Sequence, residues 1–262
     1  MDTRLDTVIH ASALVDPGCE LGMGVSVGPW AIVGPRVRVG DGTEIGPRVL
    51  IEKDTSVGED CRIFNGAVLG TDPQDLKYMG EDTVLEVGDR AVIREFATLN
   101  RGTAASGRTV VGSDGLVMAY AHVAHDCVLG NHVILANAVT MGGHVVMEDW
   151  VTVGGLTGIH QFVRIGAHAF VGGASRITQD VPPYCMAVGN PPELSGLNSV
   201  GLERRGISSD VKAALKHAYR ILFQSKLNLS QALSKVEADV PGIPEVLHLL
   251  AFIRGSERGI VI

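Results

Sequence analysis

An aliphatic residue returns at every sixth position over most of this 262-residue chain, in a single phase that runs from Ile9 to Ile177. Of the 29 positions in that phase, 26 hold Ile, Val, Leu or Met, and the exceptions are Asp75, Glu81 and Ala105. A period of six fits neither the α-helical turn of about 3.6 residues nor the two-residue alternation of a half-buried strand. It is typical of a hexapeptide parallel β-helix, in which three hexads form one triangular coil.

Two other hexad positions support this interpretation. The fourth residue after each aliphatic slot is small, as at Ala31 and Val37, and paired large and small side chains fill a narrow interior without voids. Glycine often follows the aliphatic slot, as at Gly28 and Gly40. We expect these glycines to supply the left-handed backbone angles of the corners. Known rods of this kind coil left-handed, against the usual preference of parallel crossovers, so the predicted fold is mainly β, a left-handed parallel β-helix of hexapeptide repeats.

The repeat also predicts the domain organisation. A rod covers residues 1–190, and its two interruptions predict loops near 71–85 and 100–110. Residues 191–262 lack the six-residue period and form a C-terminal α-helical domain. We expect this domain to cap the last open coil, whose exposed strand edges would otherwise invite aggregation.

Apolar residues at helical spacing predict three helices in this cap. The first begins near Ser209, where Ser and Asp residues provide start signals. The second covers about 230–238, and the third begins at Pro244, a residue that is favoured in the first turn of a helix.

Composition excludes several classes of protein. The chain has 29 acidic and 22 basic residues, and its net charge of −7 argues against general nucleic-acid binding. No apolar stretch reaches the roughly 20 residues that span a bilayer, and the first residues lack a secretory pattern, so we expect a cytoplasmic protein without a membrane span. Cys19, Cys61 and Cys127 occupy the small inward slot, and Cys185 has no partner in the pattern, which favours packing over disulfide or metal chemistry.

Polar residues that the repeat does not need collect in three successive coils. They are His122, His125, Asp126, His144, His160 and Gln161. With three hexads in each coil, His125, Gly143 and Gln161 fall in one column, and Asp126 and His144 share the adjacent column. A histidine can accept a proton near neutral pH, Asp126 can orient it, and the N–H of a glycine can stabilise an oxyanion. The cluster predicts acyl transfer to a hydroxyl or amine. A zinc site built from imidazoles is the alternative.

Two further patterns each have a functional and a structural interpretation. Asn137, Gly155 and Gly173 follow one another at intervals of three hexads, and the next interval reaches Pro191. This column predicts a groove for an alkyl chain whose length is set near Gly173, unless its glycines serve only packing.

The second pattern is a basic stripe on the first cap helix, where Lys212, Lys216 and Arg220 recur at every fourth position. It is either a solvated face or a docking site for an acidic partner.

Motifs along the whole chain resemble those of the acyl-[acyl-carrier-protein]–UDP-N-acetylglucosamine O-acyltransferases, which open lipid A synthesis. The motifs are Pro73-Gln74-Asp75-Leu76-Lys77-Tyr78, Asn100-Arg101-Gly102-Thr103, Ala121-His122-Val123-Ala124-His125-Asp126-Cys127, Gly143-His144, Ile159-His160-Gln161-Phe162, Gln179-Asp180-Val181-Pro182-Pro183-Tyr184 and Gly201-Leu202-Glu203-Arg204-Arg205-Gly206. The hexad alone is weak evidence for function, but the His-Asp pair and the Arg-Arg pair are specific.

The resemblance implies a role for each matching residue. His125 is the general base that takes a proton from the sugar 3-hydroxyl, Asp126 supports it, and the N–H of Gly143 faces the thioester oxygen. The sugar and acyl groups would be held by Gln74, Asp75, Lys77, His122, His144, His160 and Gln161, and the uridine diphosphate by Asn198, Arg204 and Arg205.

The resemblance also implies the reaction and the partners. An (R)-3-hydroxyacyl group moves from acyl carrier protein to the 3-hydroxyl of UDP-N-acetylglucosamine, in a homotrimer with sites between adjacent rods. The chain needs no metal and no cofactor of its own, because the acyl donor is carried on the phosphopantetheine of the carrier. This acidic carrier protein is the partner expected for Lys212, Lys216 and Arg220.

The sequence departs from the usual family pattern at Glu203, which precedes the arginine pair, and at Gly115. The first departure predicts slightly weaker phosphate attraction. Three alternatives share the repeat. One is the N-acyltransferase of the same pathway, which carries a uridine-binding domain ahead of its rod, whereas here the repeat begins by Ile9. The others are a zinc hydratase and a non-catalytic scaffold.

Overall fold

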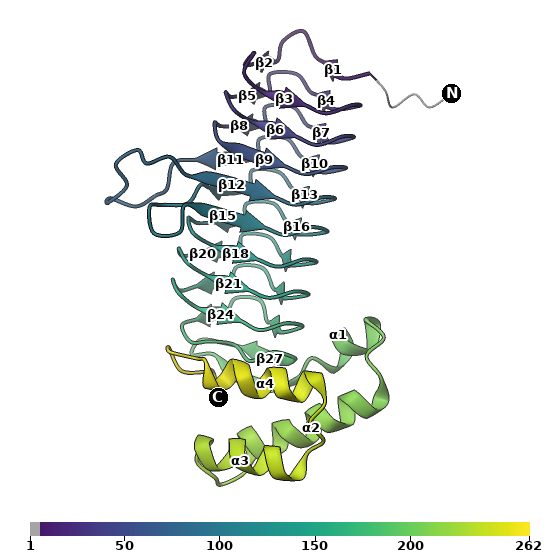
Figure 1. Ribbon diagram of the computed structural model, residues 1–262, viewed down its shortest axis with the longest axis vertical. Coiled ribbons are helices and arrows are strands. Elements are labelled where there is room, and N and C mark those ends of the chain that lie inside the picture. The colour runs from purple at the N-terminus through teal and green to yellow at the C-terminus, as the bar shows by residue number, and fades with distance from the viewer. Residues whose placement is uncertain (1–5) are drawn as a thin grey trace.

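The computed structural model describes residues 6–262, which form a long three-sided rod with a helical cap at one end (Figure 1). Each side of the rod is a sheet of very short strands, stacked one coil on the next, and all of the strands pair in parallel except the last, which pairs antiparallel with its neighbour. In spatial order the 11-stranded sheet contains β1 (Val8–Ile9), β4 (Ser26–Val27), β7 (Glu44–Ile45), β10 (Arg62–Ile63), β13 (Val92–Ile93), β16 (Leu116–Val117), β19 (Ile134–Leu135), β22 (Thr152–Val153), β25 (Phe170–Val171), β27 (Cys185–Val188) and β28 (Glu193–Leu197).

The other two sheets have the same construction. The 9-stranded sheet contains β2 (Leu14–Val15), β5 (Ile32–Val33), β8 (Leu50–Ile51), β11 (Val68–Thr71), β14 (Thr98–Asn100), β17 (His122–Val123), β20 (Thr140–Met141), β23 (Gly158–Ile159) and β26 (Arg176–Ile177). The 8-stranded sheet contains β3 (Glu20–Leu21), β6 (Arg38–Val39), β9 (Thr55–Val57), β12 (Val84–Val87), β15 (Arg108–Val111), β18 (Val128–Leu129), β21 (Val146–Met147) and β24 (Arg164–Ile165). The predicted left-handed parallel β-helix is confirmed.

The strand register explains why the six-residue aliphatic repeat keeps the same phase after each of the two loops. Most coils pair residues that are three hexads apart, as Ser26 pairs with Glu44. Arg62 pairs with Val92, and Val92 with Leu116, so the first loop adds two hexads to its coil and the second loop adds one. Because both insertions are whole hexads, every later aliphatic slot still points inward.

The interior of the rod is one continuous apolar column. Large and small inward residues alternate along each coil, and both kinds are buried: Val27 and Val33 from the aliphatic slot, and Val25 and Ala31 from the small slot, are at most 2% exposed. Close-packed interiors tolerate neither voids nor excess volume. Each coil therefore depends on the coils above and below it for its burial.

The predicted role of the glycines after the aliphatic slot is wrong. Gly28 and Gly40 do not have positive φ angles. The left-handed angles belong to the third residue after the slot, which is usually not glycine, as at Trp30 and Arg36, both with φ of 57°. Glycine is required at Gly28 and Gly40 because the coils approach closely there. A Cβ on Gly40 would lie 2.6 Å from the backbone carbon of Gly58.

Four helices follow the rod and pack over its end (Figure 1). They are α1 (Ser199–Arg204), α2 (Ser209–Gln224), α3 (Leu229–Asp239) and α4 (Pro244–Arg254). The side chain of Ser208 caps α2, and Asn228 and Gln231 form a capping box at α3. The structure thus adds α1, which was not predicted because so short a helix carries too little periodicity. None of the helices within residues 6–262 combines the length and the apolar character needed to cross a bilayer.

Candidate functional site

Two loops leave the same side of the rod (Figure 1). The first loop, residues 72–83, joins β11 to β12, and the second loop, residues 101–107, joins β14 to β15. The second loop reaches the corner that follows β17 in the next coil, where His125 and Asp126 lie. The second loop therefore brings irregular backbone to a corner that the repeat alone would leave bare.

His125 and Asp126 form a hydrogen-bonded pair at this corner. The Nδ1 atom of His125 lies 2.7 Å from Oδ2 of Asp126, so the other ring nitrogen, Nε2, is left for a substrate. The side chain of His125 is 14% exposed, whereas that of Asp126 is fully buried. This arrangement fixes the orientation of the imidazole and keeps one face of the pair approachable.

The second loop holds the Asp126 carboxylate. Thr103 donates its N–H to Oδ1 (3.0 Å) and its hydroxyl to Oδ2 (2.7 Å), and the Ser106 hydroxyl also donates to Oδ1. Burial raises the pKa of Asp126, but the hydrogen bonds from Ser106, His125 and Thr103 outweigh burial and lower the pKa to about 2. Asp126 is therefore ionised at neutral pH and can stabilise a protonated imidazole.

Gly143 lies directly against the His125 ring. A Cβ on Gly143 would come within 2.7 Å of His125 Nε2, so no larger residue fits beneath the imidazole. At another corner of the rod, each equivalent backbone N–H donates to a side chain of the next coil. The N–H of Ser113 donates to Oδ1 of Asn131 (2.9 Å), and the N–H of Asn131 donates to Oδ1 of Asp149 (2.7 Å). Among residues 6–262 the N–H of Gly143 has no such acceptor. It is a free donor beside the candidate base.

His144 completes the cluster and raises the question of a metal. Its Nε2 lies 3.6 Å from Asp126 Oδ2, and its ring stacks on Phe162 with a centroid separation of 4.4 Å. The ligand atoms of His125, Asp126 and His144 lie within 4.8 Å of one another. However, both Asp126 oxygens already accept hydrogen bonds from the second loop and from His125. A zinc ion would have to displace these bonds, which disfavours the metal alternative.

The other predicted polar residues lie around this corner. The Nδ1 atom of His122 is 2.7 Å from the Thr98 hydroxyl, and burial, with a smaller contribution from the charge of His125, lowers the pKa of His122. The Nδ1 atom of His160 lies 3.0 Å from the carbonyl of Gln161. The side chain of Gln161 is exposed and makes no hydrogen bond within the described chain. It is available to a ligand.

Thr98, Thr103 and Ser106 contact the cluster but were not predicted as site residues. They hold His122 and Asp126, as described above. The two loop residues have no fixed register with the coils, so the three-hexad spacing cannot place them. The sequence offers two signals: the second loop interrupts the repeat one coil before the His-Asp pair, and the motif Asn100-Arg101-Gly102-Thr103 includes Thr103 without giving it a role.

The first loop makes no hydrogen bond or ion pair with the histidines of the described chain. Asp75 accepts a hydrogen bond from the N–H of Lys77 (3.0 Å), which shapes the tip of the loop. Leu76 and Met79 project into solvent and are 103% and 86% exposed. In residues 6–262 no hydrogen bond or ion pair joins Gln74, Asp75 or Lys77 to the histidine cluster.

The predicted uridine diphosphate residues lie on a different face of the rod. Asn198, Arg204 and Arg205 line a cavity of about 560 Å³ on the outer surface of the 11-stranded sheet. The Arg205 guanidinium stacks over Trp150, 5.2 Å from the ring centroid, and burial lowers its pKa. Asn198 caps α1 by accepting from the N–H of Gly201 (3.1 Å). The structure brings these three residues together, but not with His125, which lies at a corner between the other two sheets.

The glycine column is present, but it ends earlier than predicted. A Cβ on Gly155 would lie 3.0 Å from the Asn137 carbonyl, and one on Gly173 would lie 3.2 Å from the Gly155 carbonyl, so the three residues stack. The predicted extension to Pro191 is wrong. Val171 pairs with Ala187, because the last coil is two residues shorter than the others.

The basic stripe lies on α2. Lys216 and Arg220 are exposed and Lys212 is half-buried. Lys216 and Arg220 line a small pocket of about 240 Å³ with Tyr219. None of the three cations has an ion-pair partner in residues 6–262.

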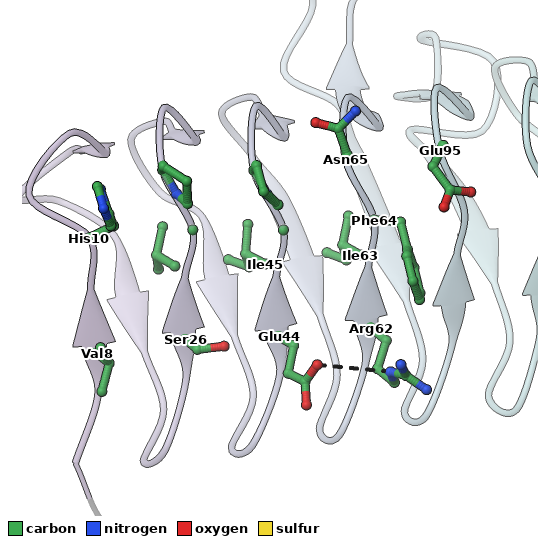
Figure 2. A pocket seen from close by; sticks show the side chains of 15 residues that line it. Val8, His10, Ser26, Glu44, Ile45, Arg62, Ile63, Phe64, Asn65 and Glu95 are labelled. Carbon is green, nitrogen blue, oxygen red and sulfur yellow. Dashed lines mark ion pairs between the residues drawn. The ribbon is translucent and has the colours of Figure 1, made fainter.

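Another pocket, of about 480 Å³, lies on the N-terminal half of the 11-stranded sheet (Figure 2). It is lined by Phe64 and by an ion pair in which Arg62 Nε lies 3.9 Å from Glu44 Oε2. The pocket lies mainly on coils before the first loop, with Glu95 from the coil after it, and contains none of the predicted site residues. It offers no paired base and oxyanion donor, so the candidate site remains the corner at His125.

Comparison with known proteins identifies relatives over the whole chain. Residues 180–261 match the family model described as UDP-N-acetylglucosamine O-acyltransferase, domain 2. The acyl-[acyl-carrier-protein]–UDP-N-acetylglucosamine O-acyltransferase of Paracidovorax citrulli is 57% identical over 257 residues, covering 96% of this chain and 98% of that protein. The Chlorobaculum tepidum protein of the same name is 60% identical over 245 residues, covering 93% of each chain.

Solved structures agree with these relatives. The UDP-N-acetylglucosamine acyltransferase LpxA of Bacteroides fragilis superposes with a TM-score of 0.95 at 42% identity, covering 97% of this chain and 99% of that chain. LpxA of Acinetobacter baumannii gives a TM-score of 0.94 at 42% identity, covering 97% and 100%.

Proposed function

The chain belongs to the acyl-[acyl-carrier-protein]–UDP-N-acetylglucosamine O-acyltransferase family, and we propose that it transfers an (R)-3-hydroxyacyl group from acyl carrier protein to the sugar 3-hydroxyl with His125 as general base. This is the first step of lipid A biosynthesis. One observation supports this mechanism most directly. The Asp126 carboxylate is hydrogen-bonded to Nδ1 of His125, so Nε2 stays free, next to Gly143, whose N–H is unpaired.

In the proposed reaction the acyl group passes directly from the carrier to the sugar, by addition and then elimination. His125 Nε2 removes the proton of the sugar 3-hydroxyl as its oxygen attacks the thioester carbonyl carbon. The N–H of Gly143 donates to the oxyanion of the tetrahedral intermediate. The C–S bond then breaks, and the carrier thiol leaves with the proton from His125. General-base assistance is worth about 10²–10⁴-fold and an oxyanion donor about 10²–10³-fold.

Asp126 supports this proton transfer without taking part in it. With its pKa near 2, the carboxylate stays charged while His125 gains and loses a proton. Its bond to Nδ1 selects the tautomer that presents Nε2 to the sugar. No covalent enzyme intermediate is needed. Burial also raises the pKa of the thiol of Cys127, the cysteine next to Asp126, to about 12, so that thiol is a poor nucleophile.

We assign the remaining candidate residues to substrate contacts. Gln74, Asp75 and Lys77 of the first loop hold the sugar together with His122, His144, His160 and Gln161. Asn198, Arg204 and Arg205 hold the uridine diphosphate, for which the fork of an arginine is well shaped. The exposed column that ends at Gly173 accepts the acyl chain. The unpaired Lys212, Lys216 and Arg220 bind acyl carrier protein.

The positions of these residues favour a homotrimer with sites shared between subunits. One chain presents His125 at one corner and the arginine pair on a separate face, so a complete site needs a second chain. The same reasoning applies to the first loop, which makes no hydrogen bond or ion pair with the histidines of the described chain. We also propose a cytoplasmic location and no metal or cofactor beyond the carrier's phosphopantetheine.

The test is acyl transfer to UDP-N-acetylglucosamine from a series of acyl carriers, with product masses measured for wild type and His125→Ala. We expect His125→Ala to fold, to assemble and to lose at least about a hundredfold in kcat. His10→Ala is the matched control, because His10 is an exposed histidine far along the rod from the second loop. Near-normal turnover of His125→Ala would remove His125 from the mechanism.

A further inference from the structure

Arg101 is a fully buried cation at the base of both loops. Its guanidinium is 0% exposed, and it donates to the Gly70 carbonyl, to Asp72 Oδ1 and, at 3.1 Å, to the hydroxyl of Tyr78. Oε2 of Glu52 lies 3.8 Å from the same guanidinium. Burying an unpaired charge is costly, so the charge and the fork of an arginine explain this set of partners.

Two partners of Arg101, Asp72 and Tyr78, belong to the first loop, and Gly70 lies in β11 just before it, whereas Arg101 itself begins the second loop. Tyr78 lies within the first loop, where its hydroxyl also donates to the Glu81 carbonyl (3.0 Å). Two residues after Arg101, Thr103 makes two hydrogen bonds to Asp126. A chain of contacts therefore runs from the first loop through Arg101 and Thr103 to the carboxylate that orients His125.

We propose that Arg101 is a positioning residue that couples two neighbouring sites: it links the first loop, which holds the sugar in a site shared with the adjacent chain, to the His125–Asp126 pair of its own chain, which removes the proton in the next site. When substrate orders the first loop, the fixed Tyr78–Arg101 contact holds the start of the second loop, and Thr103 keeps Asp126 in place. This inference rests on the proposed function, because it assigns the sugar to the first loop and the base to His125.

Backbone geometry makes the connection between Arg101 and Thr103 stiff. The N–H of Arg101 donates to the Thr71 carbonyl (3.0 Å), so the backbone of Arg101 is also bound to the start of the first loop. At Gly102 any Cβ would collide with the backbone of Arg108. Because the second loop is closed tightly on itself, a displacement of Arg101 is passed on to Thr103.

Stability alone does not account for an arginine here. A buried ion pair replaced by apolar side chains of similar volume is often neutral or stabilising, and in residues 6–262 the Nε atom of Arg101 has no hydrogen-bond partner. The cost of burying this group is better explained by the geometry that its fork imposes on Gly70, Asp72 and Tyr78.

The test uses Tyr78→Phe, which removes one hydroxyl without changing the size of the ring, in the full-length assembled enzyme. Hydrogen exchange of residues 72–83 and 101–107 is measured by mass spectrometry, together with KM for UDP-N-acetylglucosamine. We expect faster exchange in both loops and a KM raised about tenfold, because a hydrogen bond to a charged group is lost. KM for the acyl carrier should not change.

Two other variants sharpen this test. Arg101→Lys keeps the charge but not the fork, and Tyr78→Phe should have no further effect in that background. Tyr120→Phe is the matched control, since the hydroxyl of Tyr120 makes no hydrogen bond within residues 6–262 and its ring stacks on Phe96, away from the first loop. If Arg101→Lys does not fold, Tyr78→Phe alone decides.

Hydrogen exchange and acyl-transfer activity together distinguish a failure of the Arg101 coupling from a failure of the proposed function. Faster exchange confined to residues 72–83, with an unchanged KM for the sugar, would overturn the coupling even in an active acyltransferase. Coupled exchange in a protein that transfers no acyl group to the sugar would overturn the proposed function and would leave Arg101 with a purely structural role.

Discussion

Gly143 has no room for a side chain, because a Cβ would lie 2.7 Å from the Nε2 atom of His125. We predict that Gly143→Ala pushes the imidazole out of line and lowers kcat at least about a hundredfold, as loss of a well-placed base does. Its φ angle is not positive, so the backbone accepts alanine and the protein should still fold. Gly115→Ala is the control, since the nearest atom to its Cβ would be 3.5 Å away. Equal activity of the two variants would contradict the proposed geometry.

The lowered pKa of Asp126 predicts that the stability of the protein depends on pH. Its pKa is about 2 in the folded protein and near 3.8 in an ordinary environment, so its charge stabilises the fold above about pH 4, and this contribution is lost as the pH falls towards 2. The shift corresponds to about 2 kcal/mol. In urea unfolding between pH 5 and pH 2, the stability advantage of wild type over Asp126→Asn should shrink by this amount. Parallel curves for the two proteins would show that Asp126 has an ordinary pKa.

The sequence predicts the part of the site that the repeat controls. The three-hexad step places Gly143 one coil beyond His125, and the structure stacks the two residues. It cannot place Thr103, Ser106 or Arg101, because loop residues have no fixed register with the coils. Their contacts with Asp126 and the first loop depend on how each loop folds back, which no period encodes.

At the scale of the coils, the glycines after the aliphatic slot allow successive coils to approach closely, whereas the sequence had suggested that they supply left-handed corner angles. We predict that Gly40→Ala destabilises the rod by at least about 1 kcal/mol, because its Cβ would overlap the next coil, 2.6 Å from Gly58. Gly158→Ala should be neutral or stabilising, because no atom lies within 4 Å of its Cβ and alanine lowers the entropy of the unfolded chain. Free energies of unfolding in urea check both. Similar losses at both positions would contradict a role in close coil packing.

The end of the rod shows where periodicity stops being informative. The last coil loses two residues, so the left-handed corner angle moves from the expected position 186 to Tyr184, with φ of 66°. Val181, Pro182 and Pro183 mark this irregularity in the sequence, but they do not give its length. The short helix α1 follows the same irregular stretch, and this is why both features were missed while the three longer helices were predicted.

For the whole molecule, the separation of the candidate residues has a consequence for assembly. His125 lies at the corner between the 9-stranded and 8-stranded sheets, whereas Arg205 lies over Trp150 beside the 11-stranded sheet. If one chain supplied both groups to one substrate, the sugar and the diphosphate would have to span two faces of a rod. Adjacent rods in a closed ring solve this problem, because each interface pairs one face with a different face of its neighbour.

Subunit mixing tests this assembly directly. His125→Ala and Arg205→Ala should each be nearly inactive alone. When the two chains are co-expressed at equal amounts and form random trimers, about a quarter of the interfaces pair an intact His125 with an intact Arg205 of the neighbour. We therefore expect activity to recover to about a quarter of the wild-type value per site, whereas sites built within single chains would recover none. Mixing His125→Ala with Gly143→Ala is the control, because those residues touch within one chain and every site then keeps a defect. Recovery in that control, or none in the first mixture, would contradict shared sites.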